Sequence, residues 1–186
     1  HSVGLRTNGT LWAWGFGGAG RLGDGTVVSK NSPVSVVGGF TDWCQASAGL
    51  FHSIAVRRNG SAWGWGCGSC GRLGDGTETN RSSPASVVGG FTDWCQVSAG
   101  MGGDAFSLGV RQNGTAWGWG RNINGTLGNN CVGSGQVSSP VSVVGGFTDW
   151  CQVSAGASHS LGLRTNGTAW AWGSGSFGAL GDNTGT

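Results

Sequence analysis

The sequence predicts an all-β fold made of repeated units, and three observations support this prediction. One 18-residue phrase, Ser-Pro-Val-Ser-Val-Val-Gly-Gly-Phe-Thr-Asp-Trp-Cys-Gln-Val-Ser-Ala-Gly, occurs with small changes at 32–49, 83–100 and 139–156. A second phrase, Asn-Gly followed by Trp-x-Trp-Gly, occurs four times at spacings of 51, 54 and 53 residues. The 41 glycines follow no Gly-X-Y period, so they are best explained as turns between many short strands.

Residue alternation within one unit predicts four strands, which we name A to D. In the second unit they are expected at Trp43–Ala48, His52–Arg57, Ser61–Gly66 and Pro84–Val88. Asn59-Gly60 between strands B and C predicts a hairpin with a type I′ turn. The proline that begins strand D suits an edge strand. Four antiparallel strands per unit at this period predict the blade of a β-propeller.

The whole chain is predicted to be a single repeat array with units at about 1–51, 52–105, 106–158 and 159–186. The first unit has no strand A, and the fourth ends before strand D, which leaves two whole blades and two incomplete ones in about three and a half repeats. Open sheet edges promote strand addition and association. We therefore expect flanking residues of a longer chain, or other copies, to complete a closed propeller or a fibre.

Bulk composition excludes two classes of partner. The net charge is +2 and Lys30 is the single lysine, so the chain has no basic stripe for nucleic acid. No apolar run approaches 18 residues, which argues against membrane insertion. The expected core is aromatic, and its structural tryptophans are Trp12, Trp14, Trp63, Trp65, Trp117, Trp119, Trp170 and Trp172.

Three linked motifs together resemble the regulator of chromosome condensation repeat. They are Gln-Val-Ser-Ala-Gly-x-x-His-Ser-Leu, Asn-Gly-Thr-x-Trp-x-Trp-Gly and Gly-x-Leu-Gly-Asp-Gly, and the resemblance covers essentially the whole chain. It implies a propeller of usually seven blades, of which this chain holds about half. Members of that family include a chromatin-bound exchange factor for a small GTPase, inhibitor proteins, ligase subunits and near-identical arrays in bacterial and viral surface proteins. The near-identity of the three long phrases here looks most like the last group.

Several repeated polar residues are expected to be structural. His1, His52 and His159 share one repeat position, but the third copy has Phe106 there, which argues against a metal site. One acidic residue per loop is too few for calcium, so Asx turns are expected at Asp24, Asp75, Asn129 and Asp182. Two further sets are expected at one end of the propeller as inter-blade ion pairs or turn hydrogen bonds: Arg6, Arg57, Arg111 and Arg164, with Asp42, Asp93 and Asp149.

The six cysteines form two sets. Cys44, Cys95 and Cys151 each follow the tryptophan of strand A, and we expect them to be small buried hydrophobes too far apart for disulfides. Cys67 and Cys70 form a Cys-x-x-Cys pair in one loop, and Cys131 lies in the next C–D loop. For these three residues a possible loop disulfide and free thiols remain as alternatives, and an unpaired one would be available to cross-link neighbours.

Function is expected to lie on one loop face. The B–C turns and D–A loops hardly change between units, whereas the A–B and C–D loops vary, and a constant scaffold with one variable face is typical of binding proteins. Apolar residues stand in those variable loops at Phe16, Leu50, Phe51, Met101, Ile123 and Phe177. Clustered exposed apolar residues mark an interaction surface.

The sequence thus favours a non-enzymatic structural or interaction propeller without metal or cofactor. No Ser/His/Asp set and no paired carboxylates converge or repeat in it. The first interpretation is a self-assembling protein displayed outside a cell or on a virion, as a filament or oligomer. The alternative is a soluble regulatory or inhibitory propeller that binds one protein partner.

Overall fold

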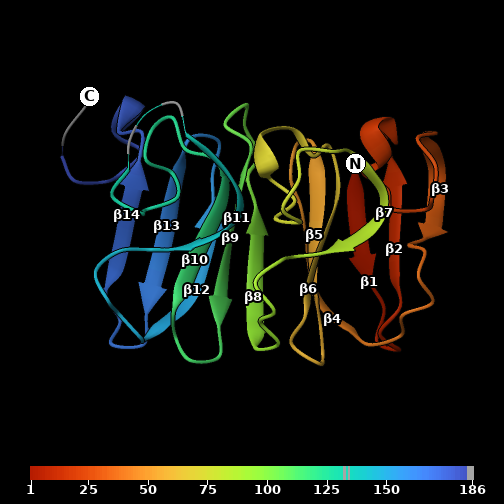
Figure 1. The fold of residues 1–186 in the computed structure, drawn as a ribbon, viewed down its shortest axis with the longest axis horizontal. Helices are drawn as coiled ribbons and strands as arrows, with labels where there is room; N and C mark the ends of the chain where they lie inside the picture. Colours follow the sequence, from red (N-terminus) through yellow and green to blue (C-terminus); the bar gives the residue numbers. More distant parts are fainter. Residues whose placement is uncertain (132, 134, 184–186) are drawn as a thin grey trace.

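The computed structural model describes residues 1–131, 133 and 135–183, and these form four antiparallel sheets (Figure 1). The sheets, which we call blades 1 to 4, lie side by side from the N-terminal to the C-terminal end of the molecule. Short 3-10 turns, η1 (Gly18–Gly20), η2 (Ser69–Gly71) and η3 (Ser176–Gly178), follow the third strand position of blades 1, 2 and 4. The all-β prediction is confirmed.

The strands of each blade follow one another in chain order. Blade 1 contains β1 (Ser2–Leu5), β2 (Leu11–Gly15) and β3 (Lys30–Ser35). Blade 2 contains β4 (Trp43–Ala48), β5 (His52–Arg57), β6 (Ala62–Gly66) and β7 (Arg81–Ser86). Blade 3 contains β8 (Trp94–Ala99), β9 (Phe106–Arg111), β10 (Ala116–Arg121) and β11 (Gln136–Ser142). Blade 4 contains β12 (Trp150–Ala155), β13 (His159–Arg164) and β14 (Ala169–Gly173).

The predicted pattern of whole and incomplete blades is confirmed. Blades 2 and 3 have four strands, while blades 1 and 4 have three strands each in the described part of the chain. In blade 2 the predicted strands A and B match the observed bounds, and strand C begins one residue later than predicted. Strand D begins earlier, at Arg81, and Pro84 lies in β7, which pairs with β6 only. The expected last residues of the fourth unit, 184–186, lie outside the described residues.

The B–C turn is a hairpin, but its predicted type I′ conformation is wrong. Gly60 has φ of 76°, whereas Asn59 is not among the residues with positive φ. Gly60 N donates to Arg57 O, and Arg57 N donates to Ser61 O, which is the three-residue hairpin with a type I turn and a glycine bulge. The Asn59 side chain accepts from Ser61 N, so asparagine serves as a side-chain acceptor here rather than as a left-handed residue.

Each interface between blades joins an aromatic face to an aliphatic one. Trp43 and Trp65 of blade 2, with ring centres 6.1 Å apart, pack on Leu11 and Ala13 of blade 1. Equivalent clusters lie between blades 2 and 3 and between blades 3 and 4. Burial of the Trp-x-Trp-Gly tryptophans varies: Trp65 and Trp119 are fully buried, Trp170 is 44% exposed, and the others are partly buried.

A glutamine on the inner strand of one blade clamps the inner strand of the next. Gln96 Nε2 donates to Val153 O and Gln96 Oε1 accepts from Val153 N, both at 2.7 Å. Gln45 makes the same pair of bonds to Val97. Two residues later in each strand, a serine hydroxyl accepts from the next blade's backbone. One side chain thereby satisfies both backbone groups of a residue on the neighbouring sheet.

The open face of blade 4 carries the same residues, and no further blade covers it within the part of the chain that the structure describes. Gln152, the equivalent of Gln45 and Gln96, is exposed. Leu161 and Leu163 are 45% and 37% exposed, whereas their equivalents Leu108 and Val110 are fully buried under blade 4. The side chains that accept a following blade are therefore in place on this face.

The clamp predicts a difference between two identical substitutions. Gln96→Ala removes two hydrogen bonds and leaves a backbone N–H and C=O of Val153 unpaired, which should lower the free energy of unfolding by about 2 kcal/mol. Gln152→Ala is the matched control, because that side chain is exposed, and it should cost about 0.5 kcal/mol or less. Urea unfolding of both variants measures this, and equal losses would contradict the clamp.

Candidate interaction face

The A–B and C–D loops emerge together at the upper end of the blades in Figure 1, and we call this end the loop face. All six predicted binding residues lie on these loops. Five of them are exposed, from 37% for Ile123 to 105% for Phe177, and Phe51 is partly buried. The sequence argument therefore located apolar side chains that the fold leaves at the surface.

Backbone hydrogen bonds join neighbouring A–B loops across the loop face. Leu50 N of blade 2 donates to Gly100 O of blade 3 at 3.2 Å. Met101 N of blade 3 donates in the same way to Gly156 O of blade 4 at 3.1 Å. These bonds join the A–B loops of blades 2, 3 and 4 into one continuous ledge, on which Leu50, Phe51 and Met101 stand.

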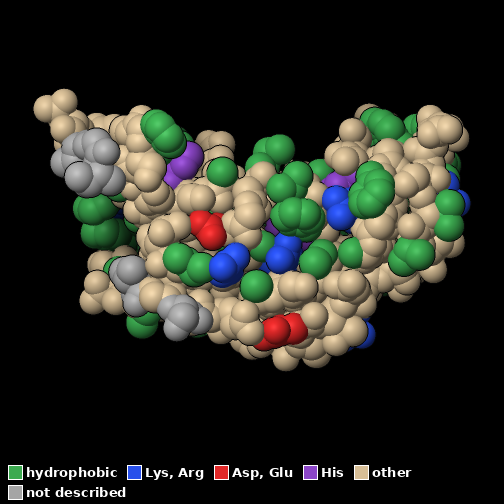
Figure 2. Space-filling model, turned by 90° about the horizontal axis from the view of Figure 1, so that it is seen from above, with side chains coloured by type: hydrophobic (Ala, Val, Ile, Leu, Met, Phe, Trp, Pro, Cys, Tyr) green, Lys and Arg blue, Asp and Glu red, His purple; other side chains and the backbone are tan. Residues whose placement is uncertain are grey.

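Arginine and phenylalanine side chains alternate over blades 1 and 2. The Arg21 guanidinium lies 4.7 Å from the ring centre of Phe16 and 5.6 Å from that of Phe51. The Arg72 guanidinium lies 5.3 Å from the same ring centre of Phe51. We call these four residues the Arg-Phe stack. Figure 2 shows hydrophobic and basic side chains gathered over the middle of this face.

Three of the predicted binding residues meet at Arg21 of the stack. Arg21 Nη1 also donates to Leu50 O at 2.7 Å, so Phe16, Leu50 and Phe51 meet around this one guanidinium. Phe177 lies on blade 4, three blades from Phe16. Sequence reasoning missed both arginines, although Arg21 and Arg72 share one repeat position in Gly-Arg-Leu-Gly-Asp-Gly, and that match was the available signal.

Two of the three repeated histidines, His1 and His52, join neighbouring blades. His52 Nε2 lies 2.8 Å from Ser107 Oγ, and His1 Nε2 lies at the same distance from Ser53 Oγ. The Ser107 hydroxyl donates to Arg72 O, so the Nε2–H of His52 donates to Ser107. Burial first, and then the charges of Arg72 and Arg21, lowers the pKa of His52 to about 3. His52 is therefore a neutral hydrogen-bonding residue at ordinary pH.

The acidic residues of the loops form the expected turns. Asp24 Oδ1 accepts from Thr26 N, and Asp75 Oδ1 accepts from Thr77 N, both two residues on. Asn129 accepts from Cys131 N in the same way. The second oxygens of Asp24 and Asp75 pair with Lys30 and Arg81. These carboxylates are thus occupied by local structure.

Three of the four repeated arginines form ion pairs with the repeated aspartates at the end opposite the loop face, whereas Arg6 lies 5.9 Å from the ring centre of Trp12. Arg57 Nε lies 2.8 Å from Asp42 Oδ1, and the same pair occurs in the next two blades at 2.7 Å. The carboxylate lies on the connection between two blades and the arginine on the blade that follows. Each guanidinium also covers a phenylalanine ring, as Arg57 covers Phe40 at 3.9 Å.

The prediction of buried strand A cysteines is wrong. Cys44, Cys95 and Cys151 are exposed, because each lies at a register shift directly after the buried tryptophan. The bulge turns the thiol outward, where Cys44 Sγ donates to Val56 O at 3.4 Å. Cys67, Cys70 and Cys131 are also free thiols in the structure.

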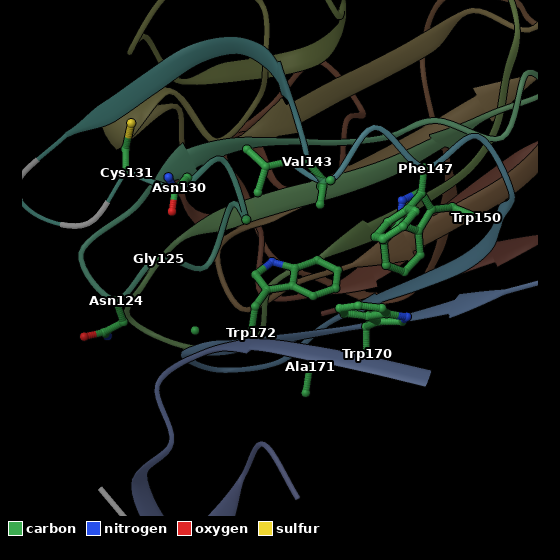
Figure 3. Close-up of a pocket in the computed structure, with 14 residues that line it drawn as sticks. Asn124, Gly125, Asn130, Cys131, Val143, Phe147, Trp150, Trp170, Ala171 and Trp172 are labelled. Carbon is green, nitrogen blue, oxygen red and sulfur yellow. The ribbon is translucent and has the colours of Figure 1, made fainter. Parts of the chain in front are cut away.

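An apolar groove of about 480 Å³ lies between blade 3 and β14 (Figure 3). Trp170 and Trp172 point from β14 into the groove toward Val143 and Phe147, while Ala171 points away. β14 pairs with β13 alone within the described residues, whereas β6 and β10 also pair with an outer strand. The groove thus lies beside the position that a fourth strand takes in blades 2 and 3.

The repeats define the class of protein: the chain belongs to the regulator of chromosome condensation (RCC1) repeat family, whose model matches residues 8–56, 59–103 and 113–163. The chain is 31% identical to the human E3 ubiquitin-protein ligase HERC2 over 192 residues, covering 99% of this chain and 4% of HERC2. It is 30% identical to the ultraviolet-B receptor UVR8 of Arabidopsis thaliana, covering 97% of this chain and 41% of the receptor.

Solved structures share the fold. Prp20p from Saccharomyces cerevisiae matches with a TM-score of 0.77 at 21% identity, covering 98% of this chain and 45% of Prp20p. Human WBSCR16 matches with the same TM-score and identity, over 92% of this chain and 44% of that protein. At this identity the two matches show a shared fold. The chain spans less than half the length of these proteins and of the relatives above.

The described residues hold neither a helix long and apolar enough to cross a membrane nor a group of three or more potential metal ligands. Most titratable residues that the sequence singled out have structural contacts: Asp24 and Asp75 in turns, His1 and His52 at blade interfaces, and Arg57, Arg111 and Arg164 in ion pairs, and Asp182 is not without a partner.

The His52 contact predicts an acid-dependent loss of stability. The folded-state pKa of about 3 lies below the ordinary 6.5, so the unfolded chain binds more protons between these values. The free energy of unfolding is therefore highest above pH 6.5 and falls as pH decreases toward 3, by on the order of 4 kcal/mol. His52→Phe, which introduces the residue that blade 3 has at this position (Phe106), should flatten this dependence. Urea unfolding from pH 7 to 4 tests this, and equal slopes for both proteins would refute it.

Proposed function

We propose that this chain is part of a regulatory propeller that binds a protein partner through its loop face, without catalysis. The observation that carries the proposal is the Arg-Phe stack, with Leu50 held beside it by Arg21. Arginine and aromatic side chains are enriched where binding energy concentrates at protein interfaces. Here Phe51 stands on an A–B loop that backbone hydrogen bonds join to the A–B loop of blade 3, through Leu50, and to the C–D loop of blade 2, through Cys67.

Relatives support the regulatory alternative over the surface-protein interpretation. A ubiquitin ligase and a light receptor contain the repeats at 30% identity or more. One structure of the same fold is yeast RCC1 (Prp20) bound to Kap60, and another describes Prp20p with its binding to Gsp1p and histones. The display of this chain on a virion or cell surface has no such support, and we do not propose it.

Binding through the loop face predicts loss of affinity on removing the aromatic rings. A proteome-derived peptide library displayed on yeast would be selected against the 186-residue chain. Binders should lose at least about tenfold in affinity for Phe16→Ser and for Phe51→Ser, the loss of roughly 1.4 kcal/mol or more expected of a central interface residue. Val37→Ser, which removes an exposed apolar side chain at the opposite end, is the control. Binders that keep full affinity for both loop variants would contradict the proposal.

The open face of blade 4 predicts association through blade edges, with flanking residues or another copy supplying the covering sheet. Sedimentation velocity of the 186-residue chain should show assembly that increases with concentration. Leu161→Glu with Leu163→Glu should abolish it, because the charges would be buried, while Val28→Glu in an exposed loop should not. A monomer at all concentrations, with Trp12 and Trp172 shielded from a collisional quencher, would be the opposite result. That result would not contradict the proposal that a protein partner binds the loop face.

A further inference from the structure

The Arg-Phe stack contains more positive charge than its surroundings balance. None of the ion pairs in the described part of the chain includes Arg21 or Arg72. Arg21 donates to Gly18 O and Leu50 O, and Arg72 Nε donates to Ser69 O. Arg72 is only 6% exposed, and its Nη1 is buried without a hydrogen-bond partner. Buried charge without a counter-charge is costly, so this position favours an anion.

The side chain that can supply an anion there is Cys67. Its backbone N donates to Phe51 O at 3.0 Å, which fixes the residue against the stack. Its Sγ lies 3.4 Å from Ser69 Oγ, and a hydroxyl can donate to a thiolate. Burial alone would raise the pKa of Cys67, but hydrogen bonds from Ser69 and the charges of Arg72 and Arg21 outweigh it and lower the pKa. The side chain is partly exposed.

The cysteines of strand A have the opposite environment. Cys44 Sγ and Cys95 Sγ donate to the carbonyl oxygens of Val56 and Val110. A carbonyl accepts only from the protonated thiol, so this contact disfavours the thiolate. Burial, together with the nearby carboxylates of Asp42 and Asp93, raises the pKa of these two residues. The pKa is therefore lowered at Cys67 and raised at Cys44 and Cys95, although Cys44 and Cys95 are the more exposed side chains.

We propose that Cys67 is a site of thiol modification by small disulfides that carry carboxylates, of which glutathione disulfide is the type. The Cys67 thiolate attacks one sulfur of the disulfide, a new S–S bond forms, and the old one breaks. The second half leaves as a thiolate, so the exchange needs no other oxidant. Arg21 and Arg72 provide the positive charge that attracts the carboxylates and stabilises the attacking sulfur.

The modification would alter the interaction face directly. The backbone N–H of Cys67 donates a hydrogen bond to the carbonyl oxygen of Phe51. The ring of Phe51 lies close to both guanidinium groups. A glutathione group there would cover the ring and add negative charge to a basic surface. The equivalent positions of the other blades hold Phe16, Arg121 and Ser174, so the site belongs to blade 2. Binding of a partner through the loop face, which rests on the proposed function, would therefore respond to the thiol redox state.

The test compares thiols within one folded chain. The 186-residue protein would be incubated with glutathione disulfide at pH 7, and adducts would be located by peptide mass mapping over time. Cys67 should be modified at least about tenfold faster than Cys44, because a larger fraction of Cys67 is thiolate at this pH. The adduct should persist in Cys70→Ser and be absent in Cys67→Ser. Modification of Cys44 or Cys131 at an equal or greater rate would overturn the proposal, whether or not the loop face binds a partner.

The contribution of the Arg21 charge to the rate of Cys67 modification is tested separately. Arg21→Gln should slow modification by glutathione disulfide several-fold and leave the rate with uncharged hydroxyethyl disulfide closer to that of the original chain. Arg6→Gln, at the opposite end of the propeller, is the matched control and should change neither rate. Circular dichroism would verify that both variants remain folded. If Arg21→Gln left the rate with both disulfides unchanged, the charge of the stack would have no part in the reaction.

Discussion

The amide clamp between inner strands is the contact on which the assembly of blades depends. Separate sheets present backbone N–H and C=O groups to each other at angles that do not allow a common ladder, and buried groups of this kind must be paired. Gln45 and Gln96 pair them with side chains instead. The tryptophan faces then pack at a fixed distance, and the loop ledge at one end follows from that spacing.

Much of the fold was predictable because the repeats supply independent observations of each element. Strands A and B of blade 2 were placed to the residue, since alternation and the Asn-Gly turn delimit them. The turn type was not, because the same dipeptide fits both a two-residue type I′ hairpin and a three-residue hairpin with a glycine bulge, which differ in loop length and in the φ of Asn59. The outward position of Cys44 also escaped prediction, since a bulge after Trp43 breaks the simple alternation.

The loop face was predicted only in part. Exposed apolar residues in variable loops could be identified from composition, but the stack formed by Arg21, Phe51 and Arg72 joins two blades and a loop far apart in sequence. Spacing within one repeat cannot show that an arginine of blade 1 meets a phenylalanine of blade 2. For the same reason the sequence could not show the environment of Cys67, whose neighbours come from three different loops.

The glutamine clamp has a further consequence for how such chains change over generations. Gln45 and Gln96 make the same pair of hydrogen bonds to the next inner strand, and Gln152 repeats the residue on blade 4, so one type of junction serves successive blades. Near-identical coding segments also favour unequal recombination. Blades could then be duplicated, lost or exchanged as units, each bringing its own loops to the shared ledge. The uniformity of the scaffold would allow its binding surface to be reshuffled rather than altered one residue at a time.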